Sequence, residues 1–370
     1  MEPMDPLAEL ARDLVAIDSR SFVSNLPVAA RLAAALDGFE VEALDYADPA
    51  GVAKRVLVAH RGGPGGLALS GHMDTVPDTG WQDDPFSGRI DDAGVLHGLG
   101  SADMKGPVAA AVMAARALPA SVPVTLLLTT DEETTKQGAQ EIVARSALAR
   151  RAAPRAIAVV EPTRLIPLRG HRSSINFTVV AEGIQAHSST GAGRNANWAL
   201  VPFLAEMKAL HERLRTDPAL LDGAYDPPFS DFNLTIDNHG TAVNVTVPRA
   251  TVRIKFRYSA TVDPAPVAAA VHAAAMHAGI TVHERREGKP PELPASHGLI
   301  RLAADLAGVP PRTAAFGTDA SELSALAPCV VLGPGDIGVA HRPGESVPLA
   351  ELAAAVPLFM RLAEGVAAGW

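Results

Sequence analysis

Short apolar runs alternate with alanine-rich stretches in the first part of the chain, and this alternation limits the possible folds more than any other feature. The runs are rich in valine, leucine and isoleucine and are bounded by glycine or proline, which is typical of strands buried on both faces of a sheet. The predicted strands are Val56–His60, Leu67–Ser70, Val124–Thr129 and Ala156–Val160, and the predicted helices are Gly106–Leu118 and Gly138–Arg150. Such an order predicts a mostly parallel sheet with helices on its faces.

The pattern changes after residue 167. The following segments predict the order β-α-β-β-α-β, which is typical of a small split-βαβ, ferredoxin-like domain. They are Ser174–Ala181, Asn195–Arg215, Asp231–Ile236, Thr251–Tyr258, Pro264–His277 and Ile280–Arg285. The first pattern then returns, with a predicted buried strand at Cys329–Leu332 and a closing helix at Leu349–Glu364. We therefore expect an α/β domain of residues 1–167 and 283–370, interrupted by an inserted domain at 168–282.

Composition excludes several classes of protein. The formal net charge of −9 argues against a surface for nucleic acid or anionic membranes, since both need basic patches. The single cysteine, Cys329, excludes an intrachain disulfide framework and a cysteine-cluster metal site, and it fits a reducing compartment. The longest run of small apolar residues, Pro107–Ala115, is far shorter than a membrane helix. We expect a soluble cytoplasmic protein, in which a metal site would have to use histidines and carboxylates.

Polar residues gather where the predicted buried strands end. His72, the acidic residues 131–133, Glu161 and His341 each follow such a strand, and Asp103 precedes a helix. Each has an ordinary explanation by itself, for example a helix cap or a solvated turn. Together they indicate one shared site, because ligands bind beyond the carboxyl ends of parallel strands. Two histidines with three or more carboxylates suit zinc, cobalt or manganese, and their number indicates two metal ions.

Five motifs resemble those of the M20 metallopeptidase/deacylase family, which includes acetylornithine deacetylase, succinyl-diaminopimelate desuccinylase and carboxypeptidase G2. They are Ser70–Pro77, Ser101–Gly106, Thr130–Glu133, Glu161–Thr163, and Gly333–Asp336 with His341. The resemblance covers nearly the whole chain and is greatest for the acetylornithine deacetylase branch. It implies a zinc-peptidase-like, three-layer α/β catalytic domain with an inserted ferredoxin-like α+β dimerisation domain.

The resemblance also implies roles for residues of the metal site. One metal ion would be held by His72, Asp103 and Glu161, and the other by Asp103, Glu133 and His341, with Asp103 as the bridge. Glu132 would be the general base, and Asp74 would fix the ring of His72. The peptide bond between Asp103 and Met104 would be cis.

A second set of roles concerns the substrate. His187 resembles the histidine that reaches across a dimer to the oxyanion of the partner's reaction intermediate, and Asn244 and Arg257 resemble residues that bind the substrate's α-carboxylate. Gly317 and Thr318 resemble a loop on the substrate side of the metals. Departures from the family pattern, such as Leu99 and Ala186 where arginine and glycine are usual, leave the particular substrate open.

The resemblance therefore implies a homodimeric, two-metal amidohydrolase that removes an acyl group, most simply acetyl, from an N-acyl amino acid. Desuccinylase, dipeptidase and carboxypeptidase activities are the nearest alternatives. A non-catalytic binding homologue is a remote one, because every metal-ligand position and the base are filled. A dinucleotide-binding protein is excluded, since no Gly-x-Gly-x-x-Gly follows a first strand.

Overall fold

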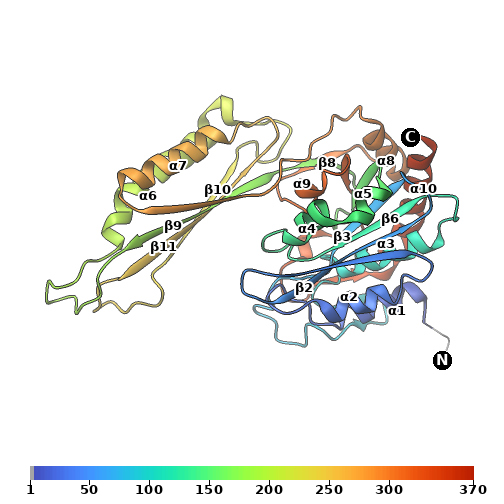
Figure 1. Ribbon diagram of the computed structural model, residues 1–370, viewed down its shortest axis with the longest axis horizontal. Coiled ribbons are helices and arrows are strands. Elements are labelled where there is room, and N and C mark those ends of the chain that lie inside the picture. The colour runs from blue at the N-terminus through green and yellow to red at the C-terminus, as the bar shows by residue number, and fades with distance from the viewer. Residues whose placement is uncertain (1–3) are drawn as a thin grey trace. The chain divides into compact units, whose positions relative to one another are not determined.

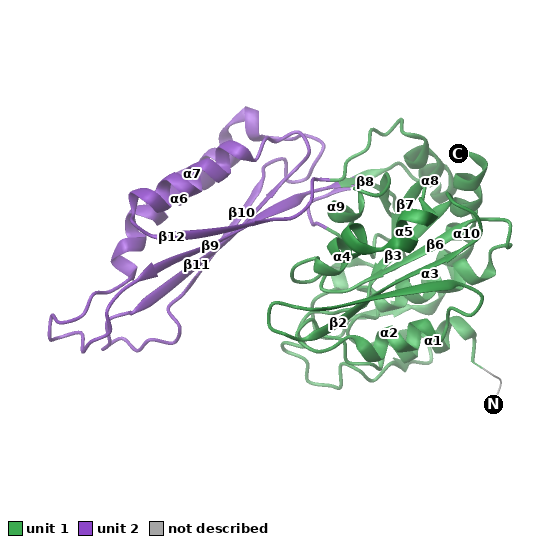
Figure 2. Ribbon diagram, viewed as in Figure 1, with its two compact units in different colours: residues 1–170, 291–312, 318–370 green, residues 171–290, 313–317 purple. Residues whose placement is uncertain are grey.

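The structure is a computed structural model that describes residues 4–370, so residues 1–3, with which the predicted first domain begins, lie outside it. The chain divides into two compact units (Figure 2). Unit 1 comprises residues up to 170 together with 291–312 and 318–370, and unit 2 comprises 171–290 and 313–317. Within the described residues, no helix is long and apolar enough to cross a membrane.

Unit 1 is built on a large sheet with the strand order β1-β2-β6-β3-β7-β14-β8-β13. The central strands β6, β3, β7 and β14 are parallel, and β1 and β2 join antiparallel at one side. The strands are β1 (Glu40–Ala47), β2 (Ala53–Arg61), β3 (Leu67–His72), β6 (Val124–Thr129), β7 (Ala156–Val159), β8 (Leu168–His171), β13 (Arg312–Ala314) and β14 (Cys329–Val331). Strands β3, β6 and β7 are buried along their whole length, as their apolar runs predict.

Helices cover both faces of this sheet, which gives three layers (Figure 1). One face carries α1 (Pro6–Val15), α2 (Leu26–Ala33), α3 (Lys105–Ala117), α8 (Gly298–Ala307) and α10 (Leu349–Ala368), which share one apolar core with the sheet. The other carries α4 (Gln137–Arg145), α5 (Ala147–Ala152) and α9 (Ala320–Leu323). A small sheet of β4 (Arg89–Ile90), β5 (Val95–His97) and β15 (Ser346–Pro348) and a 3₁₀ turn at Ile337–Val339 complete the unit.

The single helix predicted over Gly138–Arg150 is wrong, because the chain leaves the helical conformation at Ser146. Ser146 has extended dihedral angles and its hydroxyl accepts a hydrogen bond from the backbone N–H of Ala149, so it begins α5 as an N-cap. The carboxylate of Glu42 on β1 accepts from the N–H groups of Ala147 and Leu148 at the same helix start, each at 3.1 Å. This contact between distant segments offsets the loss of helical hydrogen bonds.

Unit 2 has the predicted order β-α-β-β-α-β, in which two helices pack on one antiparallel sheet. The sheet order is β10-β11-β9-β12, the strand arrangement of a ferredoxin-like fold. Its elements are β9 (Ser173–Glu182), α6 (Asn197–Thr216), β10 (Asp231–Asp237), β11 (Arg249–Tyr258), α7 (Ala265–His277) and β12 (Thr281–Arg286), with a 3₁₀ turn at Pro218–Leu220. The predicted fold class, an α/β domain with an inserted α+β domain, is confirmed.

Candidate metal centre

The carboxyl ends of the parallel strands β3, β6, β7 and β14 meet at one edge of the large sheet. His72 is the last residue of β3, and Glu133 and Glu161 lie in the segments that follow β6 and β7. Asp103 lies just before α3 and forms the cis peptide bond with Met104 that the family resemblance implies. Chain topology thus brings residues that are far apart in sequence to one edge.

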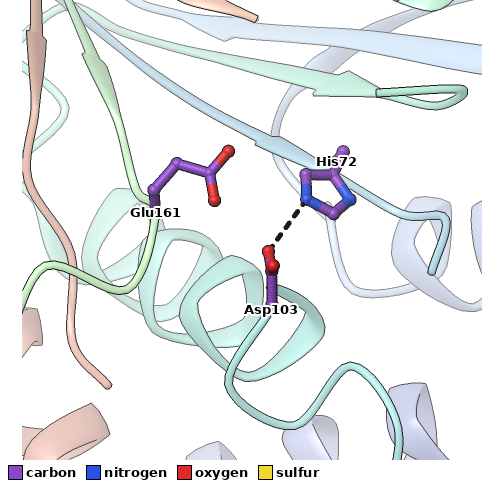
Figure 3. A group of neighbouring side chains, drawn as sticks. All are labelled: His72, Asp103 and Glu161. Atoms are coloured by element: carbon purple, nitrogen blue, oxygen red, sulfur yellow. Dashed lines mark hydrogen bonds and ion pairs between the residues drawn. The ribbon is translucent and has the colours of Figure 1, made fainter. Parts of the chain in front are cut away.

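Three of these side chains point toward one another: His72, Asp103 and Glu161 (Figure 3). Each offers one ligand atom, and these atoms all lie within 4.8 Å of one another. Nε2 of His72 lies 3.1 Å from Oδ1 of Asp103. All three residues are buried, at 1%, 6% and 4% exposure.

A second group shares Asp103 and adds Glu133 and His341. Nε2 of His341 lies 3.0 Å from Oε1 of Glu133 and 3.2 Å from Oδ2 of Asp103. The two carboxylate oxygens of Asp103 therefore face different histidines, Oδ1 toward His72 and Oδ2 toward His341. A carboxylate placed in this way can bridge two cations.

Negative charge exceeds positive charge in this cluster, which is buried except for the half-exposed His341. Hydrogen bonds to Asp103 and Glu133 raise the pKa of His341 to about 11, and burial raises the pKa of Glu133 to about 7. Burial also raises the pKa of Glu161 well above its ordinary value. Among residues 4–370, no group donates a hydrogen bond to the Glu161 carboxylate. A buried carboxylate without a donor is costly, so this set of nitrogen and oxygen ligands fits divalent cations well.

Asp74 holds two parts of the site together. Its backbone carbonyl accepts a hydrogen bond from Nδ1 of His72 at 2.9 Å, closer than its carboxylate, which lies 3.5 Å away. The carboxylate accepts instead from the backbone N–H groups of Glu132 and Glu133, at 3.2 and 3.4 Å, and from the hydroxyl of Ser21 at 2.9 Å. Asp74 therefore orients the His72 ring chiefly through its carbonyl and the loop after β6 through its side chain.

Glu132 lies beside the metal ligands but belongs to neither group. Its side chain is 10% exposed, and its Oε1 lies 3.8 Å from the ammonium of Lys136. Burial raises the pKa of Glu132 above its ordinary value, while Lys136 acts in the opposite direction. A carboxylate whose pKa is raised accepts a proton more readily, which suits a general base.

Two buried residues, Lys136 and Asp319, also lie near Glu132. Lys136, which has a positive φ and is 5% exposed, donates from Nζ to the backbone carbonyl of Thr318 at 2.9 Å. The carboxylate of Asp319, 2% exposed, accepts from the Thr129 hydroxyl, and its Oδ1 has no hydrogen-bond partner among the described residues. Burial, with a further contribution from Glu132, raises the pKa of Asp319 well above its ordinary value. Lys136 was not singled out from the sequence, in which two threonines separate it from the acidic residues 131–133.

The predicted substrate-loop residues Gly317 and Thr318 lie where the chain passes from unit 2 to unit 1. Thr318 is 1% exposed, and its hydroxyl accepts from the N–H of Ala320 at the start of α9. Its side chain therefore holds the turn that leads into α9, while its carbonyl binds Lys136.

The other predicted substrate residues lie within unit 2. His187 and Asn244 are exposed and lie on neighbouring segments, joined by the hydrogen bond from the N–H of Ser188 to the carbonyl of Asn244. Arg257, on β11, donates from Nη1 to the carboxylate of Asp231 at 2.5 Å. The Arg257 side chain is one-third exposed, so it is held in place and remains accessible to solvent.

This geometry gives a three-layer α/β unit two groups of side chains that could hold metal ions, and comparison with known proteins shows its family. The model of peptidase family M20/M25/M40 matches residues 68–365. The chain belongs to this family of metal-dependent hydrolases. It is 35% identical over 362 residues to an acetylornithine deacetylase of Myxococcus xanthus and 32% identical over 364 residues to one of Proteus mirabilis, with 92% of each chain covered in both comparisons.

Solved structures share the fold at lower sequence identity. An M20 family metallo-carboxypeptidase, Sso-CP2 from Sulfolobus solfataricus, has a TM-score of 0.77 at 15% identity, covering 99% of this chain and all of that one. The YXEP protein of Bacillus subtilis, described as a dinuclear metal-binding peptidase of the M20 family, has a TM-score of 0.64 at 17% identity and 98% coverage of both chains.

Proposed function

We propose that this protein is a two-metal amidohydrolase that removes an acetyl group from an N-acetyl amino acid, with acetylornithine as the leading substrate. The observation that carries the proposal is the pair of ligand groups that share Asp103, with Glu132 beside them. The acetylornithine deacetylases of two bacteria, similar over nearly the whole chain, support this choice of substrate.

The residues for two cations are those of the two groups. His72, Asp103 and Glu161 would hold one, and Asp103, Glu133 and His341 the other. Zinc is the leading candidate, with cobalt and manganese as alternatives, because these ions accept mixed imidazole and carboxylate ligands. When bound, the two ions would polarise the substrate carbonyl and lower the pKa of water.

The chain's own residues supply the proton transfers. Glu132 takes a proton from the attacking water and later gives it to the leaving amine, which its raised pKa and the nearby Lys136 make possible. Asp74 keeps the backbone of Glu132 and Glu133 in place during these transfers.

His187 would stabilise the oxyanion of the tetrahedral intermediate. The backbone N–H of Ser189 donates to Nδ1 of His187 at 3.3 Å, and the Ser189 hydroxyl lies 2.8 Å from the same nitrogen. Because Nδ1 accepts a hydrogen bond, the proton of the neutral ring lies on Nε2, which is then the donor. Asn244 and Arg257 would bind the substrate's α-carboxylate, and Gly317 and Thr318 would line its path to the metals.

The working protein would be a cytoplasmic homodimer that associates through unit 2, with His187 acting in the partner subunit's active site. Support comes from the apolar side chains that α6 exposes: Trp198 is 75% exposed and Val201 is 54% exposed, three residues apart on one helix face. Exposed apolar patches of this kind commonly mark interfaces between proteins.

The decisive experiment measures amine release from a panel of N-acetyl, N-succinyl and N-formyl amino acids and of dipeptides, each with zinc, cobalt or manganese. We expect the highest kcat/KM for N-acetylornithine. Preference for a succinyl substrate or a dipeptide would replace the proposal with one of its alternatives, and no turnover with metal bound would indicate a non-catalytic homologue.

A Glu132→Gln variant tests the role of the base. It should bind metal and fold like the wild type but lose about 10²–10⁴-fold in kcat. Retained turnover would refute the assignment of Glu132.

A further inference from the structure

Glu345 is a buried carboxylate close to the candidate metal centre to which no role has been given above. It follows His341 closely in sequence and is 1% exposed. Its Oε1 accepts hydrogen bonds from the backbone N–H of Ala102 at 2.9 Å and from that of Asp103 at 3.0 Å. Its own backbone carbonyl accepts from the N–H of Gly98 at 3.1 Å. One residue thus binds the segment of residues 98–103 at both ends.

The segment that Glu345 binds is held only partly by its own hydrogen bonds, which run from the N–H of Ser101 to the carbonyl of Gly98 at 3.0 Å and from the N–H of Lys105 to the carbonyl of Gly100 at 2.7 Å. Gly98 and Gly100 both have positive φ values, +140° and +82°, which only glycine adopts easily and which a flexible chain readily leaves. Between them and α3 lies Asp103, whose two oxygens must face different ligand histidines. The position of Asp103 therefore depends on contacts from elsewhere in the chain.

Glu345 also joins the two halves of one ligand group. Asp103 comes from the segment before α3 and His341 from the segment after β14, and their side chains meet at 3.2 Å between Oδ2 and Nε2. Because Glu345 is in the same segment as His341 and its carboxylate holds the backbone of Asp103, it ties these ligands together. Its burial keeps water from replacing those hydrogen bonds, so their loss would leave two buried N–H groups without an acceptor.

We propose that Glu345 is a positioning residue: by accepting hydrogen bonds from the N–H groups of Ala102 and Asp103, it fixes the bridging carboxylate relative to His341 and so sets the affinity for metal ions. The inference rests on the metal centre proposed above.

The test is zinc affinity, measured on the metal-free full-length protein by competition with a chelator. Residues that hold metal ligands in place typically change affinity by 10–100-fold when they are removed. We expect a loss of about 10–100-fold in Glu345→Ala. Glu345→Gln should stay within about threefold of the wild type, because one amide oxygen can still accept from both N–H groups.

Glu42→Ala is the matched control. The Glu42 carboxylate also accepts from two backbone N–H groups, those of Ala147 and Leu148, but on strand β1. It should lose stability without losing zinc affinity. Glu345→Asp is a milder variant for use if Glu345→Ala fails to fold, because its shorter side chain cannot keep both hydrogen bonds. Its zinc affinity should fall between that of Glu345→Gln and the value expected for Glu345→Ala.

The outcomes separate the two proposals. Wild-type protein that takes up no zinc refutes the metal centre and the inference with it. Wild-type uptake with unchanged affinity in folded Glu345→Ala or Glu345→Asp refutes the inference alone. An equal loss in the alanine and glutamine variants would refute positioning by hydrogen bonds, since the glutamine variant retains an acceptor.

Discussion

Replacing Asp74 by asparagine probes how the loop after β6 is held. The Asp74 carboxylate is fully buried and accepts three hydrogen bonds, from the backbone N–H groups of Glu132 and Glu133 and from the Ser21 hydroxyl. Asparagine has one acceptor oxygen and places an NH₂ group where the second oxygen was. In Asp74→Asn, one of the two backbone N–H groups therefore faces another donor.

These contacts set the expected losses of folding stability and zinc affinity in Asp74→Asn. One buried N–H group left without an acceptor costs about 1–3 kcal/mol. The two N–H groups belong to the candidate base and to a candidate metal ligand, so the loop should also shift at the metal centre. We expect zinc affinity to fall by about 10–100-fold, as for other residues that support ligands.

Urea denaturation of the metal-free protein measures the loss of folding stability, and chelator competition measures the loss of zinc affinity. Asp78→Asn is a suitable control, because the ion pair of Asp78 with Arg20 is partly exposed, at 38% and 20%, and such pairs contribute no more than about 1 kcal/mol. If Asp74→Asn changed neither quantity more than Asp78→Asn does, the role assigned to Asp74 would be wrong.

Two further predictions concern protons and tautomers. The pKa of His341 is raised to about 11 and that of Glu133 to about 7, so both groups are protonated in mildly acidic solution and must lose protons to bind a cation. Zinc affinity should therefore rise with pH, most steeply below about pH 7. Calorimetry in buffers of different ionisation enthalpy should detect the release of protons on zinc binding. A zinc affinity independent of pH would contradict this prediction. Ser189→Ala removes one hydrogen-bonding group at Nδ1 of His187, worth about 0.5–1.5 kcal/mol, so kcat should fall by about 2–10-fold. The backbone N–H at position 189 remains, so nitrogen-15 spectra should still show the ring proton on Nε2. An unchanged kcat would count against this role for Ser189.

Much of the fold could be predicted from local sequence. Strands buried on both faces need continuous apolar runs, so β3, β6 and β7 are visible in the sequence as valine- and leucine-rich stretches. The helix break at Ser146 was missed, because the serine hydroxyl and the distant Glu42 decide it rather than helix propensity.

The candidate ligands could be predicted for a similar reason. His72, Glu133 and Glu161 lie at or after the ends of parallel strands, and parallel topology brings such positions together. Asp103 lies just before α3, and His341 lies in the long segment after β14. Their assignment to two groups came from family resemblance, because spacing along the chain does not say which carboxylate faces which histidine.

The sequence by itself determined the order of the elements, the two folding patterns and the chemical types of the ligands. Only the tertiary structure decided how these ligands are supported. Lys136 and Glu345 act through contacts with segments that are distant in sequence, and no local pattern marks them. The physical reason is that a buried polar group must find its partner in space, and for these residues the chain fold alone decides which partner is near.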